Sequence, residues 1–289
     1  MTIPVKTLKS GFSIPVFGFG TWRIGGDVNR DPLNDDRGQI KAIIRALENG
    51  ITHIDTAERY AAGHAEELVG QAIKNYQRKK LFIVSKVWPN HLTFDGVLAS
   101  AVQSLKRLKT DYLDLYLIHK PNPLIPISET IRAMDKLKAE GLIRNIGVSN
   151  FSVTSLIAAQ AVSRNKIVAN QAHYNLIYRE PEAAGLLDYC QKNDVFLVAW
   201  RPVEKGILSQ KGNRNLDGLF IKNKKSPSQI AISWLVSQKN VVTLAKMVDQ
   251  NHLRENLGAL HWQMDNKDVE ILRRDFPGQK SVSDAVPLA

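Results

Sequence analysis

The stretch Ile51-Thr-His-Ile-Asp-Thr-Ala-Glu-Arg-Tyr60 indicates how the chain is organised. Its first four residues alternate apolar and polar side chains, a pattern typical of a short β-strand. Asp55 falls where that strand should end, and the phenol of Tyr60 follows five positions later. The stretch therefore predicts a strand whose outgoing loop carries both an acid and a phenol.

Strand and helix signals alternate on both sides of this stretch. Residues 5–8 and 13–16 predict a hairpin that turns through Ser10-Gly11. The strands predicted after it are 17–20, 51–54, 81–84, 113–118, 143–148, 167–169, 195–199 and 241–244. The helices predicted between and after them are 36–48, 65–75, 93–108, 128–139, 152–162, 182–192, 226–238 and 251–257. A capping residue, Asp265, predicts an extra helix that ends near Arg273.

Eight strand–helix units fit a (β/α)₈ barrel, which usually needs about 250 residues. A doubly wound sheet also alternates, but it usually stops at about five or six strands. We therefore predict an α/β fold in which residues 1–289 form one TIM-barrel domain. The hairpin is expected to plug one end of the barrel.

The composition is that of an ordinary globular protein, with 44% hydrophobic and 23% charged residues. No apolar run approaches the roughly 20 residues needed to span a membrane. The N-terminal residues also lack the pattern of a signal peptide. A single cysteine, Cys190, excludes an internal disulfide and fits the reducing cytoplasm, where we expect the protein to reside.

The formal charge of +11 raises the alternative of nucleic-acid binding. The basic clusters at residues 78–80 and 222–225 have no interleaved aromatic residues for base stacking. We therefore expect a basic, solvated surface, with neither nucleic acid nor membrane as a partner. A positive field can still speed the arrival of an anionic cofactor.

Active sites of such barrels form at the carboxyl ends of the strands, so polar residues there are the candidates. In chain order they are Asp55, Lys86, His119, Ser149, Asn150, Asn170, Gln171, Trp200, Arg201 and Lys246. The first three, together with Tyr60, form a coherent set for donating a proton.

A free phenol has a pKa near 10, which is too high for an efficient acid at neutral pH. A nearby ammonium group, Lys86, should lower the pKa of Tyr60, and Asp55 should hold Lys86 charged. His119 can hydrogen-bond a carbonyl oxygen and stabilise the charge that develops there. Taken singly, each residue has a structural alternative: a cap, a solvated lysine, a core histidine or ordinary packing. Their arrival at three successive strand ends favours function.

Other kinds of site find less support. No Cys/His pair has metal-ligand spacing, so we predict no metal site. Ser149 lacks the G-x-S-x-G setting of a hydrolase nucleophile. Gly18 and Gly20 are followed by Thr21-Trp22-Arg23, so the dinucleotide fingerprint fails at its third glycine.

These residues resemble the aldo-keto reductase family, and the resemblance extends from Gly18 to Leu257. The motifs that carry it are His53-Ile-Asp-Thr-Ala57 with Tyr60, Val84-Ser-Lys-Val87, Leu117-Ile-His119, Gly147-Val-Ser-Asn-Phe151, Asn170-Gln171 and Trp200-Arg-Pro-Val203. The resemblance implies NADPH-dependent reduction of a small aldehyde or ketone to an alcohol. In that reaction Tyr60 is the general acid, Lys86 lowers its pKa, Asp55 pairs with Lys86, and His119 orients the carbonyl.

The resemblance also implies a cofactor site. Its matching positions are Gly20, Thr21, Trp22, Asp55, Ser149, Asn150, Gln171, Trp200, Arg201, Pro202, Val203, Lys246, Arg254, Glu255 and Asn256. Among them, Ser149, Asn150 and Gln171 match positions that bind the nicotinamide carboxamide. Glu255 and Asn256 fall where the family contacts adenine.

The sequence departs from the family's pattern at three places. Trp200 replaces a tyrosine that stacks under the nicotinamide, and Arg201 replaces a serine beside the pyrophosphate. After the eighth strand, Ala245-Lys-Met-Val248 stands for the usual Pro-Lys-Ser, and His252 stands for an arginine that holds the 2′-phosphate. Lys246 remains and Arg254 is a substitute nearby, so NADPH is favoured and NADH stays open.

The resemblance places Trp22, Trp88 and His119 in the substrate pocket, with Phe17 or Phe151 as further candidates. Segments 89–94 and 209–220 and a short tail after Phe276 should shape specificity. Because the tail is short, we expect an open site for small or varied carbonyl compounds, in a monomer. The alternative is a sensor or regulatory subunit that keeps NADPH but turns over little substrate.

Overall fold

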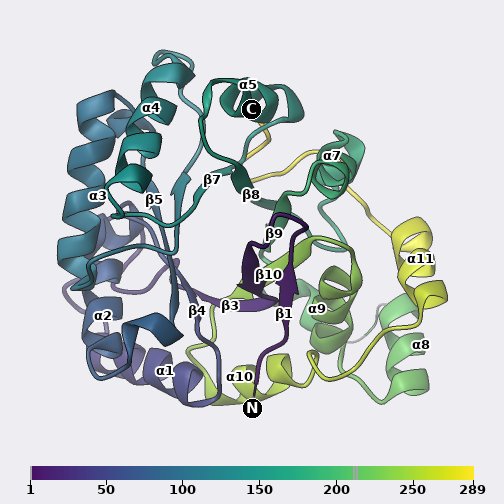
Figure 1. Cartoon of the computed structure of the whole chain (residues 1–289). Coiled ribbons are helices and arrows are strands. Elements are labelled where there is room, and N and C mark those ends of the chain that lie inside the picture. The colour runs from purple at the N-terminus through teal and green to yellow at the C-terminus, as the bar shows by residue number, and fades with distance from the viewer. Residues whose placement is uncertain (1, 211, 213) are drawn as a thin grey trace.

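The computed structural model describes residues 2–210, 212 and 214–289. A closed barrel of eight parallel strands forms its centre, in the order β10-β3-β4-β5-β6-β7-β8-β9 (Figure 1). The strands are β3 (Phe17–Gly20), β4 (His53–Asp55), β5 (Phe82–Val87), β6 (Leu115–Ile118), β7 (Ile146–Ser149), β8 (Ile167–His173), β9 (Phe196–Trp200) and β10 (Val241–Ala245). The predicted (β/α)₈ barrel is confirmed.

Helices surround the strands and pack their apolar faces against the barrel. They are α1 (Asp36–Glu48), α2 (His64–Ile73), α3 (Phe94–Leu108), α4 (Ile127–Ala139), α5 (Val153–Val162), α6 (Glu180–Ala183), α7 (Leu186–Lys192), α8 (Arg214–Asn223), α9 (Pro227–Ser237), α10 (Gln250–Leu257) and α11 (Asn266–Asp275). The start of α9 shows why these boundaries are sharp. Ser226 and Gln229 form a capping box around Pro227, so the first turn has partners for its free N–H groups.

Two predicted boundaries around β8 and β9 are wrong. The helix expected at 182–192 is two helices, α6 and α7, because Gly185 adopts a left-handed conformation with φ of 71°. The loop expected at 209–220 contains the start of α8, while residues 211 and 213 of that segment lie outside the described residues.

The predicted N-terminal hairpin is confirmed as strands β1 (Val5–Thr7) and β2 (Ser13–Pro15), paired antiparallel. The Lys6 ammonium donates to the backbone oxygens of Val236, Gln238 and Val241, at 2.7, 2.6 and 2.8 Å. These bonds tie the hairpin to the end of α9 and the start of β10. The hairpin therefore covers the barrel end at which the strands begin.

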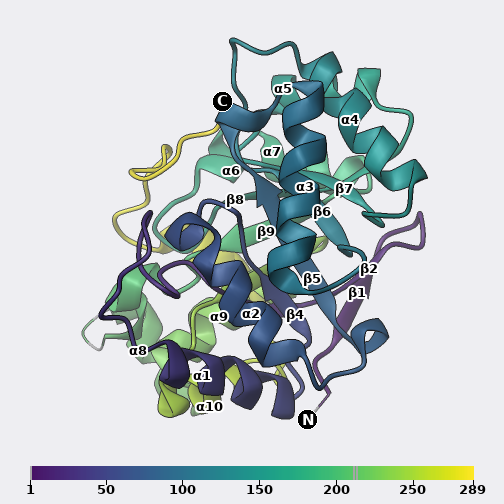
Figure 2. The same ribbon diagram turned by 90° about the vertical axis from the view of Figure 1, so that its left-hand side faces the viewer.

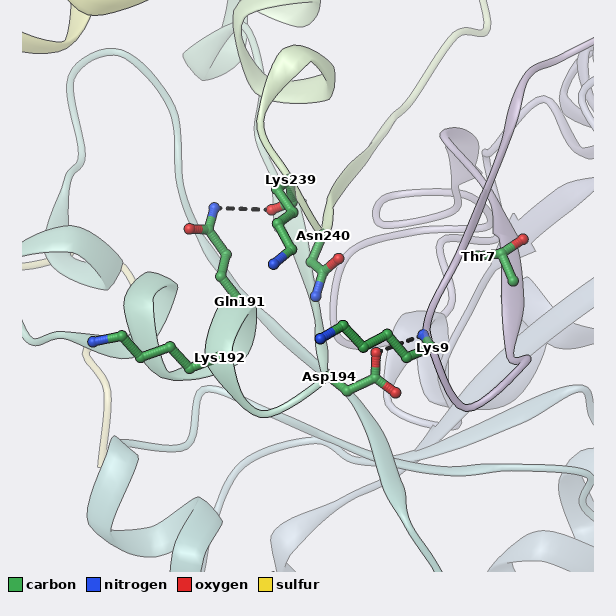
Figure 3. Close-up of a pocket in the computed structure, with 7 residues that line it drawn as sticks. All are labelled: Thr7, Lys9, Gln191, Lys192, Asp194, Lys239 and Asn240. Atoms are coloured by element: carbon green, nitrogen blue, oxygen red, sulfur yellow. Dashed lines mark hydrogen bonds between the residues drawn. The ribbon is translucent and has the colours of Figure 1, made fainter.

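A shallow hollow of about 210 Å³ lies beside this hairpin (Figure 3). Asp194 lies in it and accepts hydrogen bonds from the backbone N–H groups of Lys9 and Ser10, at 2.7 and 2.9 Å. The hairpin, the end of α7 and the loop that precedes β10 supply its remaining lining, which is Thr7, Lys9, Gln191, Lys192, Lys239 and Asn240. The hollow thus belongs to the plugged end, away from the carboxyl ends of the strands.

The C-terminal tail lies at the other end of the barrel. Figure 2 shows the purple hairpin and the yellow tail at opposite sides of the molecule. The extra helix predicted before the tail is confirmed as α11, capped by the Asp265 side chain. Among the described residues, no helix has both the length and the apolarity required to cross a membrane.

Candidate active site

Adjacent strands β4, β5 and β6 bring the predicted acid, lysine and histidine together. Asp55 pairs in register with Val84, and Lys86 pairs with Leu117, two residues before His119. The predicted ends of these two strands, at residues 54 and 84, lie one and three residues too early, so Asp55 and Lys86 lie within β4 and β5. Their side chains consequently occupy the mouth of the barrel.

Lys86 is the centre of this group. Its side chain is fully buried, and its ammonium donates to the Asp55 carboxylate at 2.5 Å, the Thr56 carbonyl oxygen at 2.9 Å and the Tyr60 hydroxyl at 3.1 Å. A buried ammonium needs an opposite charge and further acceptors to be stable. Here one carboxylate, one carbonyl and one phenol fill that requirement.

The loop after β4 sets the position of the phenol. Tyr60 begins a short 3₁₀-helix, η1 (Tyr60–Gly63), in which Ala61 and Ala62 have φ angles of 50° and 53°. This left-handed backbone is unfavourable for alanine. It is held by hydrogen bonds of 2.8 Å from Ala61 N–H to Asp27 and from Ala62 N–H to Val28. The loop therefore presents Tyr60 in a defined orientation towards Lys86.

Burial and charge act in opposite directions on Lys86 and Tyr60. Burial lowers the pKa of the Lys86 ammonium, but Asp55 and Tyr60 outweigh it and leave the pKa above its usual value. Burial raises the pKa of the Tyr60 phenol, and the Lys86 charge offsets only part of that rise. Lys86 thus acts in the predicted direction, while the net pKa of Tyr60 lies above its ordinary value.

His119 follows β6, the strand next to that of Lys86, and its imidazole is neutral. Burial lowers its pKa well below the usual value, and the charges of Lys86, Lys120 and Arg59 lower it further. The His119 backbone accepts a hydrogen bond from the Asn150 side chain at 3.0 Å. A neutral imidazole with Nε2–H can donate a hydrogen bond to an oxygen without releasing a proton.

A second group of polar residues extends from β7 and β8 to the same mouth. The side-chain amide of Gln171 donates to the second carboxylate oxygen of Asp55 at 2.9 Å. The Ser149 hydroxyl donates to the backbone oxygen of Gln171 at 3.0 Å. Asn150 has a left-handed backbone with φ of 59°, and its Oδ1 is buried without a partner. Asn170 instead bonds to the Phe151 backbone, which is a structural role.

Trp200, at the end of β9, rests on a stack of aromatic rings that the sequence did not suggest. His173 lies parallel to it at 4.2 Å, and Tyr178 stacks on the other face of His173 at 4.3 Å. The two nitrogens of His173 bond to Glu204 at 2.7 Å and to Ser283 at 2.8 Å. His173 ends β8, so the strand-end criterion that selected Gln171 also applies to it.

The loop after β9 carries Arg201, whose buried Nη1 group lacks a hydrogen-bond acceptor among the described residues. Arg201 Nη1 lies 3.8 Å from Glu204 and 4.0 Å from Asp284, and it makes no hydrogen bond. His173, Glu204 and Asp284 hold ligand-type atoms within 4.8 Å of one another. Because both imidazole nitrogens are already bonded and Arg201 adds a positive charge, we assign these residues to a hydrogen-bonded support for Trp200.

The predicted cofactor residues divide into buried and exposed sets. The buried or half-buried members are Gly20, Thr21, Trp22, Pro202, Val203, Glu255 and Asn256, the last two of them on α10. Lys246 and Arg254 are exposed beyond β10 and on α10. The Glu255 carboxylate accepts from the Ser226 hydroxyl at 2.6 Å, so it also supports the cap of α9.

Aromatic rings line the space around Tyr60 and His119. Trp22 meets Tyr60 edge-on at 5.0 Å, and Trp88 meets His119 edge-on at 5.1 Å. The two further candidates, Phe17 and Phe151, do not line this space. Phe17 is fully buried at the beginning of β3, near the plug, and Phe151 is packed in the core.

The short tail forms one wall at this end. The backbone N–H of Ala289 donates to the backbone oxygen of Asn150 at 3.0 Å. The backbone oxygen of Ala289 accepts from the Ser152 N–H at 2.8 Å. A hollow of about 340 Å³ lies between tail residues 285–289 and the loop residues Lys120 and Pro121. The tail thus borders the site on this side.

The sequence model of the Aldo/keto reductase family matches residues 16–274. A methylglyoxal reductase of Escherichia coli is 32% identical over 93% of each chain, and a glyoxal reductase of Bacillus subtilis is 35% identical over 91% of this chain and 89% of its own. A thermostable aldo-keto reductase solved with the inhibitor epalrestat is 46% identical, with a TM-score of 0.90 over 93% of this chain and 98% of its own. An aldo/keto reductase from Klebsiella pneumoniae, solved with NADP and acetate, is 29% identical, with a TM-score of 0.85 over the whole of both chains.

Proposed function

Because this chain belongs to the aldo/keto reductase family, we propose that it reduces the carbonyl group of small aldehydes or ketones to an alcohol with NADPH. The observation that carries the proposal is the Lys86 ammonium, which joins Asp55 at 2.5 Å to the Tyr60 hydroxyl at 3.1 Å. A half-buried phenol beside a buried cation is a group suited to giving a proton to a carbonyl oxygen.

The residues at the mouth fit the cofactor. Asn150 Oδ1 is a buried acceptor without a partner, and a carboxamide N–H₂ is a donor that would satisfy it. Ser149 and Gln171 complete a polar site for that amide, and Trp200 offers a planar surface supported by His173. Arg201, Lys246 and Arg254 supply positive charge for phosphate groups. NADPH, when bound, supplies the hydride.

The protein's own residues then manage the substrate oxygen and its proton. Tyr60 donates its hydroxyl proton to the carbonyl oxygen as negative charge develops there. Lys86 stabilises the phenolate that Tyr60 becomes, because its positive charge lies within hydrogen-bonding distance. His119, neutral at physiological pH, donates a hydrogen bond that orients the carbonyl. Asp55 keeps Lys86 charged throughout.

The relatives guide the choice of test substrates. Two of them are named for reduction of methylglyoxal and glyoxal, and a third was solved with NADP. Purified protein should therefore be assayed with NADPH against simple aldehydes, ketones and these two dicarbonyls. Cofactor consumption with formation of the matching alcohol supports the proposal; failure to consume cofactor with every compound rejects it.

Titration with NADPH and NADH side by side tests whether the segment after β10 binds the 2′-phosphate of the cofactor. Lys246 and Arg254 are the cations left to contact a 2′-phosphate, so NADPH should bind more tightly. Equal affinity for both cofactors would contradict that assignment. Tight binding of NADPH with negligible turnover would instead favour the sensor or regulatory subunit.

A further inference from the structure

Two cations, Arg59 and Lys120, lie near the ring of one tryptophan, Trp88. The Arg59 guanidinium lies 4.9 Å from the centre of the Trp88 ring, and the Lys120 ammonium lies 5.2 Å from it. Arg59 belongs to the loop after β4, and Lys120 belongs to the loop after β6. Loops of three neighbouring strands thus place two positive charges around one indole.

Neither charge is compensated within the part of the chain that the structure describes. Arg59 and Lys120 have no ion-pair partner there, and Arg59 Nε is buried without an acceptor. The nearest acid in sequence, Glu58, is already used: its carboxylate accepts from the Trp88 backbone at 2.6 Å and contacts His91 at 3.0 Å. Buried cationic donors without an acceptor are costly unless a ligand supplies one.

These cations are separate from those assigned to the cofactor. In the closed barrel, β5 lies four strands from β9, which is the opposite side of the mouth. Trp88 follows β5, whereas Trp200 and Arg201 end or follow β9. Trp88 instead meets His119 at 5.1 Å, and the charges of Lys120 and Arg59 reach that imidazole and help to lower its pKa, after burial and Lys86.

Space for a ligand group is available beside Lys120, since it lines the hollow of about 340 Å³ against the tail. The His119 ring connects this side to the reacting phenol, since it meets Trp88 at 5.1 Å and Tyr60 at 5.7 Å. A carboxylate in this place needs a linker of a few carbon atoms to reach a carbonyl at Tyr60.

We propose that Arg59 and Lys120 select aldehydes that carry a carboxylate a few carbon atoms from the carbonyl carbon, the ω-oxo carboxylates. This inference rests on the proposed reductase function. Arginine and lysine together bind the carboxylate, and the aldehyde carbon takes the hydride while its oxygen takes the Tyr60 proton. The product is the ω-hydroxy carboxylate, with the carboxylate unchanged.

The first test compares acids with their neutral esters. We would measure kcat/KM with NADPH for ω-oxo acids of three, four and five carbons and for their methyl esters. For the best chain length, the acid should exceed its ester by about tenfold or more, because a hydrogen bond to a charged group is worth roughly that factor. The preference should reside in KM and should shrink as salt is added.

The variants assign that preference to the two cations. In the Arg59→Met, Lys120→Met double variant, methionine keeps an apolar stem against Trp88, and the acid-to-ester ratio should fall towards one. Lys9→Met, which removes an exposed charge at the plugged end, is the matched control and should keep the full ratio. A wild-type ratio near one, or an unchanged ratio in the double variant, overturns the inference.

A second test does not depend on turnover. Glutarate is a dicarboxylate without a reducible carbonyl, and its affinity for the NADP-bound protein can be measured by calorimetry. The wild type and Lys9→Met should bind glutarate at least about tenfold more tightly than the double variant. Equal affinities reject the anion site even if neutral aldehydes are reduced. Absence of all turnover with this difference intact rejects the reductase proposal alone.

Discussion

Lys86 is charged although its side chain has no exposed surface. The carboxylate of Asp55 makes this possible, and the Tyr60 hydroxyl is held by the same ammonium. Removal of one partner of such a buried pair typically costs about 3–5 kcal/mol of stability. The residue therefore links stability to chemistry, and its variants need a folding control.

Replacement of Lys86 by methionine should lower kcat for carbonyl reduction by roughly 10²- to 10⁴-fold, the usual contribution of acid–base catalysis. The physical reason is that burial and the Asp55 charge, which both raise the pKa of Tyr60, are then no longer opposed by the Lys86 charge. Steady-state kinetics with NADPH measure the effect, and circular dichroism checks the fold. A folded variant with nearly full kcat would remove Lys86 from the mechanism.

Trp200 is the residue at which the cofactor platform can be tested. Trp200→Ala should raise the Kd for NADPH by about three- to tenfold, because an aromatic stack contributes roughly 0.5–1.5 kcal/mol. Trp200→Tyr is the matched control, since it keeps an aromatic ring on His173, and it should bind nearly as the wild type does. Fluorescence titration with NADPH measures both; identical Kd values for alanine and tryptophan would argue against stacking.

Strand β4 carries a buried histidine between the hairpin and the barrel. The ring of His53 bonds to the Pro15 backbone and meets Phe82 edge-on at 5.2 Å. Burial lowers the pKa of His53 from 6.5 to about 4. The unfolded chain therefore binds a proton at higher pH than the folded chain does, so stability is lost as pH falls below 6.5.

Between pH 7 and pH 5 this one group should reduce the free energy of unfolding by about 2 kcal/mol. Urea denaturation of the wild type and of His53→Gln at both pH values measures the change. The glutamine variant cannot take up the proton, so its loss of stability between the two values should be smaller by about that amount. Equal losses in both proteins would show that His53 does not titrate on unfolding.

Strand ends were harder to predict than strand centres, for an identifiable reason. The prediction ended the third barrel strand at residue 84, where the apolar run stops, but β5 continues through Ser85 and Lys86 to Val87. These polar side chains are accepted inside the barrel because Glu66 bonds to Ser85 and Asp55 bonds to Lys86. Such partners lie far away in sequence, so a local pattern cannot reveal them.

The same reasoning explains the candidate site. Tyr60, Lys86 and His119 could be selected from strand ends, since barrel geometry brings those ends together. His173 lies at such an end too, but its role depends on Trp200 and on Ser283 of the tail. Phe17 and Phe151 were wrongly expected in the substrate pocket, and both side chains are buried in the core. An aromatic residue near a motif does not reveal the direction in which its side chain points.

At the scale of the whole molecule, the C-terminal tail is bonded to two segments that are distant from it in sequence, at Glu180 and at Asn150. The Glu180 carboxylate accepts from the backbone N–H groups of Ser283 and Leu288, at 3.0 and 3.1 Å. Ala289 then bonds to the backbone of Asn150. Glu180 therefore holds the tail against the wall of the site.

Glu180→Ala should release residues 283–289, because each hydrogen bond to a charged group contributes roughly 1.5–3 kcal/mol. Hydrogen–deuterium exchange should become faster in that segment and stay unchanged in the barrel strands. Asp188→Ala is the control, since this carboxylate is exposed on α7 and pairs with Lys192 of the same helix. Unchanged protection of the tail in Glu180→Ala would contradict its role as the anchor.

The direct test of the central claim is transfer of deuterium from deuterated NADPH to the substrate carbon by the wild type and by Tyr60→Phe. Mass spectrometry of the alcohol measures the transfer, and fluorescence titration of the same samples measures cofactor binding. We predict a deuterated alcohol from the wild type, and almost none from Tyr60→Phe, with NADPH bound nearly equally by both. Comparable transfer by the two proteins, or loss of cofactor binding together with turnover, would contradict the assignment of Tyr60 as the proton donor.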